Sequence, residues 1–534
     1  MATISLPNAF SESYAQFDQY PLNIIRRDAH GTPMLSRIHD RLQERTPYLF
    51  IDDHNTNVAI ADVLSDGRVD RRKLYSDVEI KKWLGDASYT GSSDISIATK
   101  KDPRCRFVFL LLDSVTSPLP VSAKSVARLM TYHQVSPDFF DFLDAYGAPL
   151  AINTELRFNA FRTEIYLADP EPGAILPELG RSGRHYQINY SLKSVNRKEW
   201  MKESQPGRSL WQIRQTAIHH QLDVGSGAQF WMFADPHGAL RDRITDVFPD
   251  QPNHGQKLDS LSASFKTSLE IQLHLVRWST EGWQLYIKHL EETVAQVISR
   301  LILSNPDQRT HLRTEELMHA QAYEDTINEC IITLESNADN MSSLDTFYTS
   351  LVKQEDFPNS ERHSCEKEVQ KFTSRLHQLV YDAKMQIRRT KLLAKVMADR
   401  KLMFVQLLQV QLQARSADRA ARLSATMWRQ AEETSHEAIA MRVITVITLL
   451  YLPPTFVSTL FSTDIVKYQG DNGDLNHDMF SFLALKRFLQ VTMPLMVLTF
   501  TVAFGWVWYE RIRGKERTAR LEKEYPDVFG RARD

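Results

Sequence analysis

One uncharged stretch of this chain constrains its structure more than any other feature. About twenty residues without a charged side chain separate Arg442 from Asp464; as a helix rising about 1.5 Å per residue, they cover a hydrocarbon core of about 30 Å. A second uncharged stretch of similar length, residues 488–509, follows a short loop. The sequence therefore predicts a membrane hairpin, with one transmembrane helix over 441–464 and another over 488–509.

The first span carries a stripe of apolar and hydroxylic side chains. Its members recur every three or four residues, which places them on one face of a helix: Met441, Ile444, Thr448, Leu452, Thr455 and Thr459. A helix that lines a narrow wet path would use hydroxyl groups for hydrogen bonding, whereas a lipid-facing helix gains nothing from them. The other interpretation of each threonine is a hydrogen bond to the preceding turn or to a neighbouring helix. Pro453 and Pro454 lack amide donors inside the span, which indicates a helix packed in a bundle.

The residues around the spans predict how the hairpin is oriented. Trp506, Trp508 and Tyr509 end the second span like an interfacial aromatic belt, and a basic tail, 510–534, follows at once. By the positive-inside rule this tail is cytoplasmic, and an even number of spans then places the N-terminal part there too. The outer loop, 465–487, contains several aspartates that would concentrate cations. The N-terminus shows neither a signal nor a transit peptide, so targeting to the lipid bilayer is expected to rely on the spans.

These features together resemble a known family. A large soluble N-terminal part, a very long charged helix, two C-terminal spans, a short outer loop and a basic tail are similar to the CorA family of magnesium and divalent-cation channels. Residues 452–456, LPPTF, resemble the Pro-x-Thr-Phe of that family's first span. The resemblance is closest to the CorA-like membrane proteins of filamentous fungi, whose soluble domains are similar to residues 106–147 and 217–231. It is strong over the hairpin and the preceding helix and moderate before them.

The end of the first span departs from the family pattern. Family members carry Gly-Met-Asn there, and this chain has Ser462, Thr463 and Asp464. Asp464 keeps an oxygen ligand at the Asn position and adds a charge, so a symmetric ring of these residues would attract a divalent ion more strongly. Mg²⁺ dehydrates reluctantly, and conduction requires the ion to leave its binding site. A ring of Asp464 side chains would therefore either hold the ion too tightly to release it or suit a different ion.

The resemblance also implies roles for individual residues of the stripe. Met441 and Ile444 occupy the place of the family's hydrophobic constriction on the cytoplasmic side, and Thr455 and Thr459 occupy pore-facing positions. Ser462, Thr463 and Asp464 form the pore entrance, where Asp464 is the expected metal ligand. The resemblance further implies a homopentamer.

The soluble part begins with about 100 residues for which the sequence pattern predicts few helices or strands. From Arg106 the continuous run RFVFLLLD predicts a strand that is buried on both faces. Ser122 is the expected N-cap of a helix through Tyr132, and Pro137 opens another helix through Tyr146.

Further strands follow in the same region. They are expected at 185–192 and 216–224, and the turn Gly225-Ser226-Gly227 leads into another strand at 229–234. These elements predict an α/β cytoplasmic domain over 101–250.

Histidine and cysteine residues give no strong sign of a metal site or of catalysis. His133, His219 and His220 suggest a metal site, but Asp223 is the carboxylate close to the pair and no further ligand follows at a recognised spacing, which favours structural histidines. Three widely spaced cysteines make neither a disulfide framework nor a metal motif: Cys105, Cys330 and Cys365. A formal net charge of −2 gives no argument for nucleic acid. With no catalytic or nucleotide motif in the sequence, neither an enzyme nor an organic cofactor is expected.

The second half of the soluble part reads as helical. One or two helices are expected over 258–304 with an interruption near Gly282, and another over 310–335. Residues 359–452 contain neither glycine nor proline, and one helix of that length would extend about 140 Å. Its apolar seam changes from large to small side chains toward the membrane: Leu393, Val396, Met403, Leu407 and Val410, then Ala414, Ala417, Ala421 and Ser424. A funnel of several copies would need that change, and the alternative is a monomeric or dimeric coiled coil that ends in a membrane anchor.

The predicted fold is an α+β/α cytoplasmic domain, a very long stalk helix and a C-terminal two-helix transmembrane hairpin. The predicted organisation is 1–100, an unassigned N-terminal region; 101–250, the α/β domain; 251–358, a helical region; 359–440, the stalk; 441–464, 465–487 and 488–509, the hairpin with its outer loop; and 510–534, the tail. Two functions compete. The first is a homo-oligomer that conducts divalent cations, with Mg²⁺ as transported or regulatory ion. The second is a membrane-anchored scaffold or cation sensor that does not transport.

Overall fold

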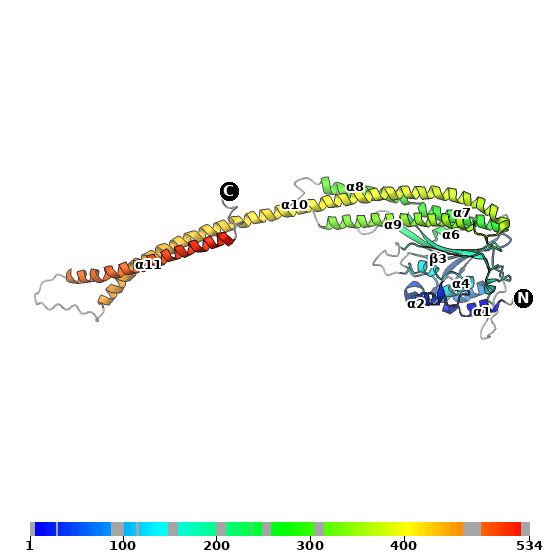
Figure 1. Ribbon diagram of the computed structural model, residues 1–534, viewed down its shortest axis with the longest axis horizontal. Coiled ribbons are helices and arrows are strands. Elements are labelled where there is room, and N and C mark those ends of the chain that lie inside the picture. Colours follow the sequence, from blue (N-terminus) through cyan, green and yellow to red (C-terminus); the bar gives the residue numbers. More distant parts are fainter. Residues whose placement is uncertain are drawn as a thin grey trace. The chain divides into compact units, whose positions relative to one another are not determined.

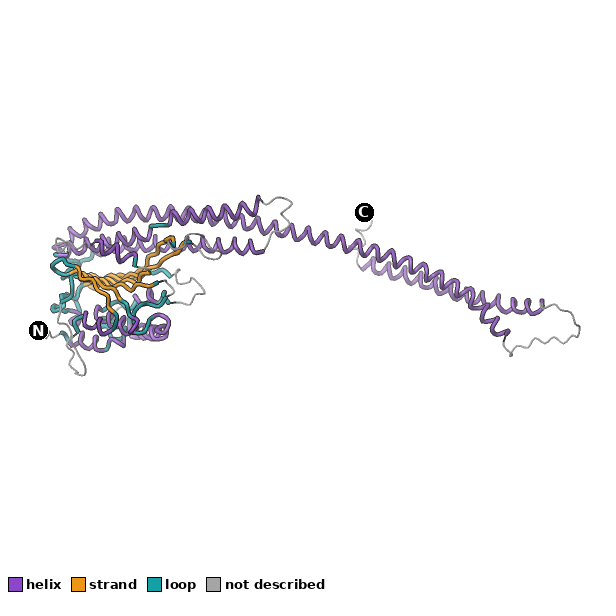
Figure 2. Tube along the Cα trace, turned by 180° about the vertical axis from the view of Figure 1, so that it is seen from behind, coloured by secondary structure: helices purple, strands orange, loops and turns teal. Residues whose placement is uncertain are grey.

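A mixed β-sheet lies at the centre of the N-terminal part of the chain (Figure 1, Figure 2). The computed structural model describes residues 6–27, 30–86, 101–113, 117–147, 158–198, 210–236, 238–247, 258–303, 314–462 and 482–524. Within them the sheet has seven strands in the order β2-β1-β3-β7-β6-β5-β4. The strands are β1 (Val58–Val63), β2 (Val69–Leu74), β3 (Cys105–Leu112), β4 (Phe161–Tyr166), β5 (His185–Arg197), β6 (Trp211–Asp223) and β7 (Gln229–Pro236). The chain divides into two units, 1–408 and 409–534, and the sheet belongs to the first.

Helices cover both faces of this sheet (Figure 1). Side chains of β1 and β3 alternate between two apolar cores, so that Val108 packs into one and Phe109 into the other. The first core is closed by α1 (Asn8–Ala15), α2 (Gly31–Leu49), α3 (Asp77–Trp83), α4 (Ala123–His133) and α5 (Phe139–Leu143). The second is closed by α6 (Ala239–Val247), α7 (Leu261–Thr280), α9 (Thr314–Leu351) and the start of α10 (Asn359–Ser462). The strand predicted from Arg106 is confirmed as buried on both faces.

Local signals position several of these elements as the sequence predicts. The Ser122 hydroxyl accepts a hydrogen bond from the amide of Ser125 at 3.2 Å and so caps α4. The turn between β6 and β7 is organised by Asp223, whose carboxylate accepts hydrogen bonds from the amides of Gly225 and Ser226 at 3.0 and 2.7 Å. The helix expected from Pro137 is shorter than predicted, because α5 spans only Phe139–Leu143.

Strands β5 and β6 are longer than predicted. Side chains of a helix form hydrogen bonds with the part of β5 that no described strand pairs on its outer side. Antiparallel pairing joins the two strands as far as Arg197, but the pairing of β5 with β4 stops at Tyr190, opposite Phe161, the first residue of β4. Beyond that point, the amide side chain of Asn340 donates to the carbonyl of Ser191 at 2.6 Å, and that of Asn337 donates to the carbonyl of Lys193 at 2.6 Å. These contacts explain why α9 continues to Leu351, past its predicted end at residue 335.

The helical region is interrupted where the sequence predicts it. Helix α7 ends at Thr280, and α8 (Trp283–Leu303) begins after Gly282. Gly282 has a φ of +79°, which favours glycine, and a side chain there would lie 2.1 Å from the carbonyl oxygen of Val195.

The second unit contains the C-terminal part of α10 and helix α11 (Phe482–Glu524). Helix α10 has 104 residues and continues through Pro453 and Pro454, so the long uninterrupted helix is confirmed. Helix α11 lies beside it in both views (Figure 1, Figure 2). The rings of Phe461 and Phe488 meet edge to face with their centroids 6.2 Å apart, and Val457 is buried beside them. The two predicted spans therefore form a helical hairpin.

Candidate functional site

Two helices among the described residues are long and apolar enough to cross a membrane. One apolar segment lies within α10 and the other is Leu485–Tyr509 in α11. Their most apolar windows are only 11% and 6% buried, whereas the core helix of a soluble protein would be mostly buried. The composition of both segments therefore matches transmembrane helices.

The predicted stripe lies on a side of α10 that α11 does not cover. Pro453 and Val457 are buried on the side toward α11. At about 100° per residue, the centre of the stripe lies roughly 150° around the helix from them. Met441 and Leu452 are accordingly 65% and 64% exposed. The stripe is thus a surface that the single chain does not cover.

One flank of the stripe borders a groove between the two helices. The groove has a volume of about 490 Å³ and is mostly apolar. Its walls are formed by Leu452, Pro453, Thr455, Phe456 and Thr459 of α10 and by Leu495 and Thr499 of α11. This groove leaves room for an apolar neighbour beside the hairpin.

Each hydroxyl of the stripe donates to a carbonyl of the preceding turn. Thr448 donates to Ile444 at 2.9 Å, Thr455 to Tyr451 at 2.8 Å and Thr459 to Phe456 at 2.8 Å. The hydrogen bonds to the preceding turn, which were the other interpretation of each threonine, are therefore present. These bonds use the hydroxyl protons and leave lone pairs on the oxygens. The three threonines therefore present acceptor oxygens on the exposed surface of the single chain.

The predicted pore entrance is described only at its first residue. Ser462 is the last residue of α10, and its hydroxyl donates to the carbonyl of Thr459 at 2.9 Å. Thr463 and Asp464 lie outside the described residues. Their role at the entrance stays a prediction.

The three histidines that suggested a metal site have structural positions. His133 stacks on Phe230 and His220 on Trp231, each with ring centroids 3.7 Å apart. His219 and His220 are neighbours on β6, so their side chains point to opposite faces of the sheet. Burial lowers the pKa of His219 to about 3 and that of His220 well below its ordinary value, which keeps both rings neutral. Stacking on aromatic rings and neutral side chains are features of structural histidines, and that role stays a prediction.

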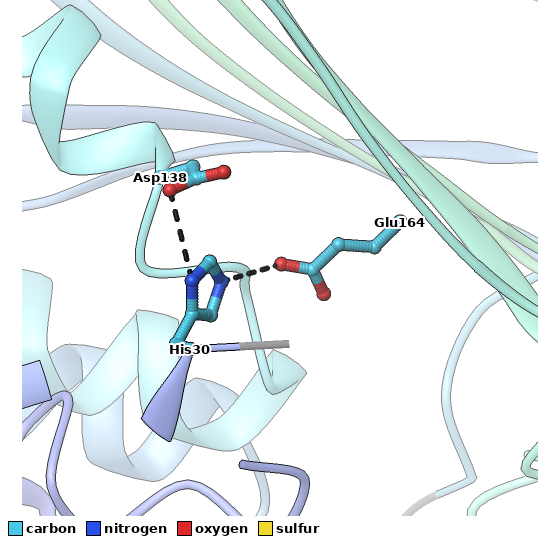
Figure 3. Close-up of side chains that lie close together, drawn as sticks. All are labelled: His30, Asp138 and Glu164. Atoms are coloured by element: carbon cyan, nitrogen blue, oxygen red, sulfur yellow. Dashed lines mark hydrogen bonds and ion pairs between the residues drawn. The ribbon is translucent and has the colours of Figure 1, made fainter. Parts of the chain in front are cut away.

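A different cluster, which the sequence did not reveal, brings a histidine and two carboxylates together (Figure 3). His30 precedes α2, Asp138 precedes α5, and Glu164 lies in β4. One potential ligand atom from each lies within 4.8 Å of the others. The three residues are far apart in the sequence and follow no recognised metal-ligand spacing. Only the folded sheet and its helices bring them together.

Comparison with known proteins assigns the chain to a family. A family model for CorA-like transporters matches residues 12–302. This match lies ahead of the spans, although the resemblance was expected to be strongest over the hairpin. No curated protein sequence gives a significant match.

Two solved structures are also similar to this chain. The CorA magnesium transporter of Methanocaldococcus jannaschii has 11% identity and a TM-score of 0.33, covering 84% of this chain and 96% of its own. The cytoplasmic domain of ZntB from Vibrio parahaemolyticus has 10% identity and a TM-score of 0.21, covering 63% and 97%. Because both TM-scores are below 0.5, the assignment depends on the family match, which spans more than half of the chain. The chain belongs to the family of CorA-like transporters.

Proposed function

We propose that this chain assembles into a homo-oligomer, a homopentamer by the family resemblance, and conducts divalent metal cations, Mg²⁺ first among them. The path is lined by the stripe of α10, and Asp464 binds the ion at the entrance. Both termini lie in the cytoplasm, and the loop 465–487 lies on the other side of the membrane. One observation carries this proposal: the stripe with its acceptor oxygens is exposed in the single chain.

Self-association is supported by the part of α10 that precedes the span. Leu423, Met427 and Trp428 are 62%, 61% and 79% exposed in the single chain. Large apolar side chains gathered on one exposed helix mark an interaction surface. One hairpin cannot enclose a water-filled path, so neighbouring copies must supply the rest of its wall.

The chemistry of the stripe fits a hydrated cation. An ion that keeps its water shell presents donor hydrogens to its surroundings, and the oxygens of Thr448, Thr455 and Thr459 accept them. The apolar side chains of Met441 and Ile444 offer no such bonds, so they form the narrow barrier of the path. Replacing one hydroxyl by a methyl group removes a hydrogen bond of about 1 kcal/mol, which slows passage about fivefold.

The test is cation flux into liposomes that hold the purified protein. Mg²⁺ would be compared with Ni²⁺ and Co²⁺, for wild type and for Thr455→Val, Asp464→Ala and Asp464→Asn. The matched control is Thr501→Val, because the hydroxyl of Thr501 also donates to its own helix, α11, at 2.7 Å but lies outside the stripe. We expect slower flux for Thr455→Val, altered flux for both Asp464 variants and wild-type flux for the control. A chain that stays strictly monomeric in mild detergent would refute the proposal.

A second function is favoured by the sequence at the pore entrance. Ser462, Thr463 and Asp464 replace the Gly-Met-Asn of the family, and a charged ring there would hold an ion too tightly to pass it. The chain would then act as a membrane-anchored scaffold or cation sensor. This function takes precedence if well-folded oligomers leave liposomes no leakier than empty ones for every ion tested.

A further inference from the structure

The cluster of His30, Asp138 and Glu164 has the composition of a metal site. Its side chains are 7%, 16% and 11% exposed, so all three lie largely out of the solvent. The imidazole lies between the two carboxylates, with Nε2 2.9 Å from Oε1 of Glu164 and Nδ1 3.9 Å from Oδ1 of Asp138 (Figure 3). The cluster thus offers one nitrogen and two oxygen ligands in a sheltered place.

Neighbouring hydroxyls hold Glu164 in position. The hydroxyl of Tyr166 donates to its Oε2 at 2.8 Å, and the hydroxyl of Ser136 donates to its Oε1. The carboxylate is therefore held in one orientation, as carboxylates that bind metals are by their outer hydrogen bonds.

The distances require only a small adjustment to hold an ion. Ligand atoms about 2.1 Å from an ion lie about 3.0–3.4 Å apart in octahedral or tetrahedral geometry. Nε2 of His30 and Oε1 of Glu164 already approach this separation at 2.9 Å. The 3.9 Å contact of Asp138 is with the other ring nitrogen, Nδ1, so the Asp138 ligand atom, which lies within 4.8 Å of the other two, has to move closer by up to about 1.5 Å. A cavity of about 30 Å³ lined by His30, Ser136, Glu164 and Tyr166 adjoins the cluster. Since one water needs about 10–15 Å³ of such space, the cavity has room for an ion and a water ligand.

The charges of the cluster also match a divalent ion. When an ion of charge +2 binds, a deprotonated imidazole and two carboxylates would supply a charge of −2 that cancels it in a sheltered environment. Arg26 also lines this cavity, where its guanidinium lies 4.2 Å from the centre of the Tyr166 ring and donates to the carbonyl of Gly183 at 2.9 Å.

We propose that His30, Asp138 and Glu164 form a binding site for a divalent transition-metal ion such as Zn²⁺, Co²⁺ or Mn²⁺. An imidazole ligand suits these ions, whereas Mg²⁺ prefers a shell of oxygens. The bound ion would tie the start of α2 to β4, which is the last strand of the sheet. This site lies in the first unit and is independent of the proposed path, so its test does not depend on transport.

Metal binding to the full-length protein in detergent tests the proposal. Protein stripped of metal by a chelator would be titrated with Zn²⁺, Co²⁺ and Mg²⁺, following calorimetric stoichiometry and the visible absorption of bound Co²⁺. The variants are His30→Gln, Glu164→Gln and Tyr166→Phe. The matched control is His377→Gln, because Nε2 of His377 also lies 3.0 Å from a carboxylate, that of Asp345, but this pair is not part of the cluster.

We expect the wild-type chain to bind one more equivalent of Zn²⁺ or Co²⁺ than the His30→Gln or Glu164→Gln chain. Loss of the outer hydrogen bond in Tyr166→Phe should weaken binding about tenfold, and the His377→Gln control should bind like wild type. An excess of Mg²⁺ should not displace Co²⁺ from the site. Full stoichiometry in folded His30→Gln and Glu164→Gln, checked by circular dichroism, would overturn the proposal, as would displacement of Co²⁺ by Mg²⁺.

Discussion

The buried lysine of β5 gives a sharp prediction about the stability of the first unit. The side chain of Lys193 is fully buried, and its ammonium donates to the carbonyl of Phe158 at 2.9 Å and to the hydroxyl of Ser336 at 3.2 Å. Burial lowers its pKa from 10.5 to about 8. The folded chain therefore binds this proton less tightly than the unfolded chain. We expect Lys193→Met to raise the free energy of unfolding at neutral pH.

The size of this effect follows from the pKa shift. A difference of about 2.5 pKa units corresponds to about 3 kcal/mol that the charged Lys193 costs the fold at pH 7. Methionine has a similar length and no charge, but it leaves the acceptors of Phe158 and Ser336 without this donor, at about 1 kcal/mol each. The net gain is therefore about 1 kcal/mol at pH 7. Because the cost of the charge disappears as the pH rises from about 8 to 10.5, the advantage of methionine should shrink by about 2–3 kcal/mol between pH 7 and pH 10.

Urea unfolding of the full-length protein in detergent measures this difference, with the fluorescence of the buried Trp231, Trp278 and Trp283 as the signal. The lost hydrogen bonds contribute equally at both pH values, so the pH dependence isolates the ionisation of Lys193. The reasoning is refuted if the difference between Lys193→Met and wild type stays constant from pH 7 to pH 10.

Two further predictions concern the same unit. Gly282→Ala should lower the free energy of unfolding by about 3 kcal/mol or more, because the added carbon meets the carbonyl of Val195 at 2.1 Å, whereas Gly505→Ala, with nothing within 4 Å, should leave urea unfolding unchanged. Burial raises the pKa of Asp235 from 3.8 to about 7. Ionisation of its carboxyl group therefore lowers the free energy of unfolding as the pH rises from about 4 to 7. Asp235→Asn keeps an acceptor for the amide of Leu240 and should gain up to about 4 kcal/mol relative to wild type between pH 4 and pH 8, measured by urea titration; equal pH profiles would contradict this.

Elements with strong local signals could be predicted from the sequence. The apolar run of β3, the cap at Ser122 and the turn after Asp223 are each defined by a few adjacent residues, and the structure confirms them. The first hundred residues gave no such signal. Strand β1 contains a buried carboxylate, Asp62, which looks misplaced until Arg106 of β3 is seen beside it at 3.1 Å. That pair, with the indole of Trp83 donating to Asp62 at 3.0 Å, exists only in the folded sheet.

The candidate sites also differ in how far the sequence could predict them. Helical periodicity predicted the stripe of α10, and the structure confirms that its members share one exposed side of the helix. Their role as the lining of a path stays a prediction, since it depends on neighbouring copies of the chain. The cluster of His30, Asp138 and Glu164 could not be predicted, because His30 and Glu164 are 134 residues apart and histidine and acidic residues are common along the chain. A contact of that kind depends on strand order, which the residues near it do not specify.

The parallel pairing of β3 with β7 has a consequence for synthesis on the ribosome. Cys105 pairs with Gln229, so 124 residues separate the partners. At about 5–20 residues per second, the apolar edge of β3 stays unpaired for roughly 6–25 s after it leaves the exit tunnel. During that time Phe109, whose covering helices α6, α7, α9 and α10 all follow β7, is open to other chains, and a chaperone that shields it would protect the nascent protein. Ribosome-bound chains that stop before β7 should therefore aggregate, whereas chains that include β7 can close the sheet.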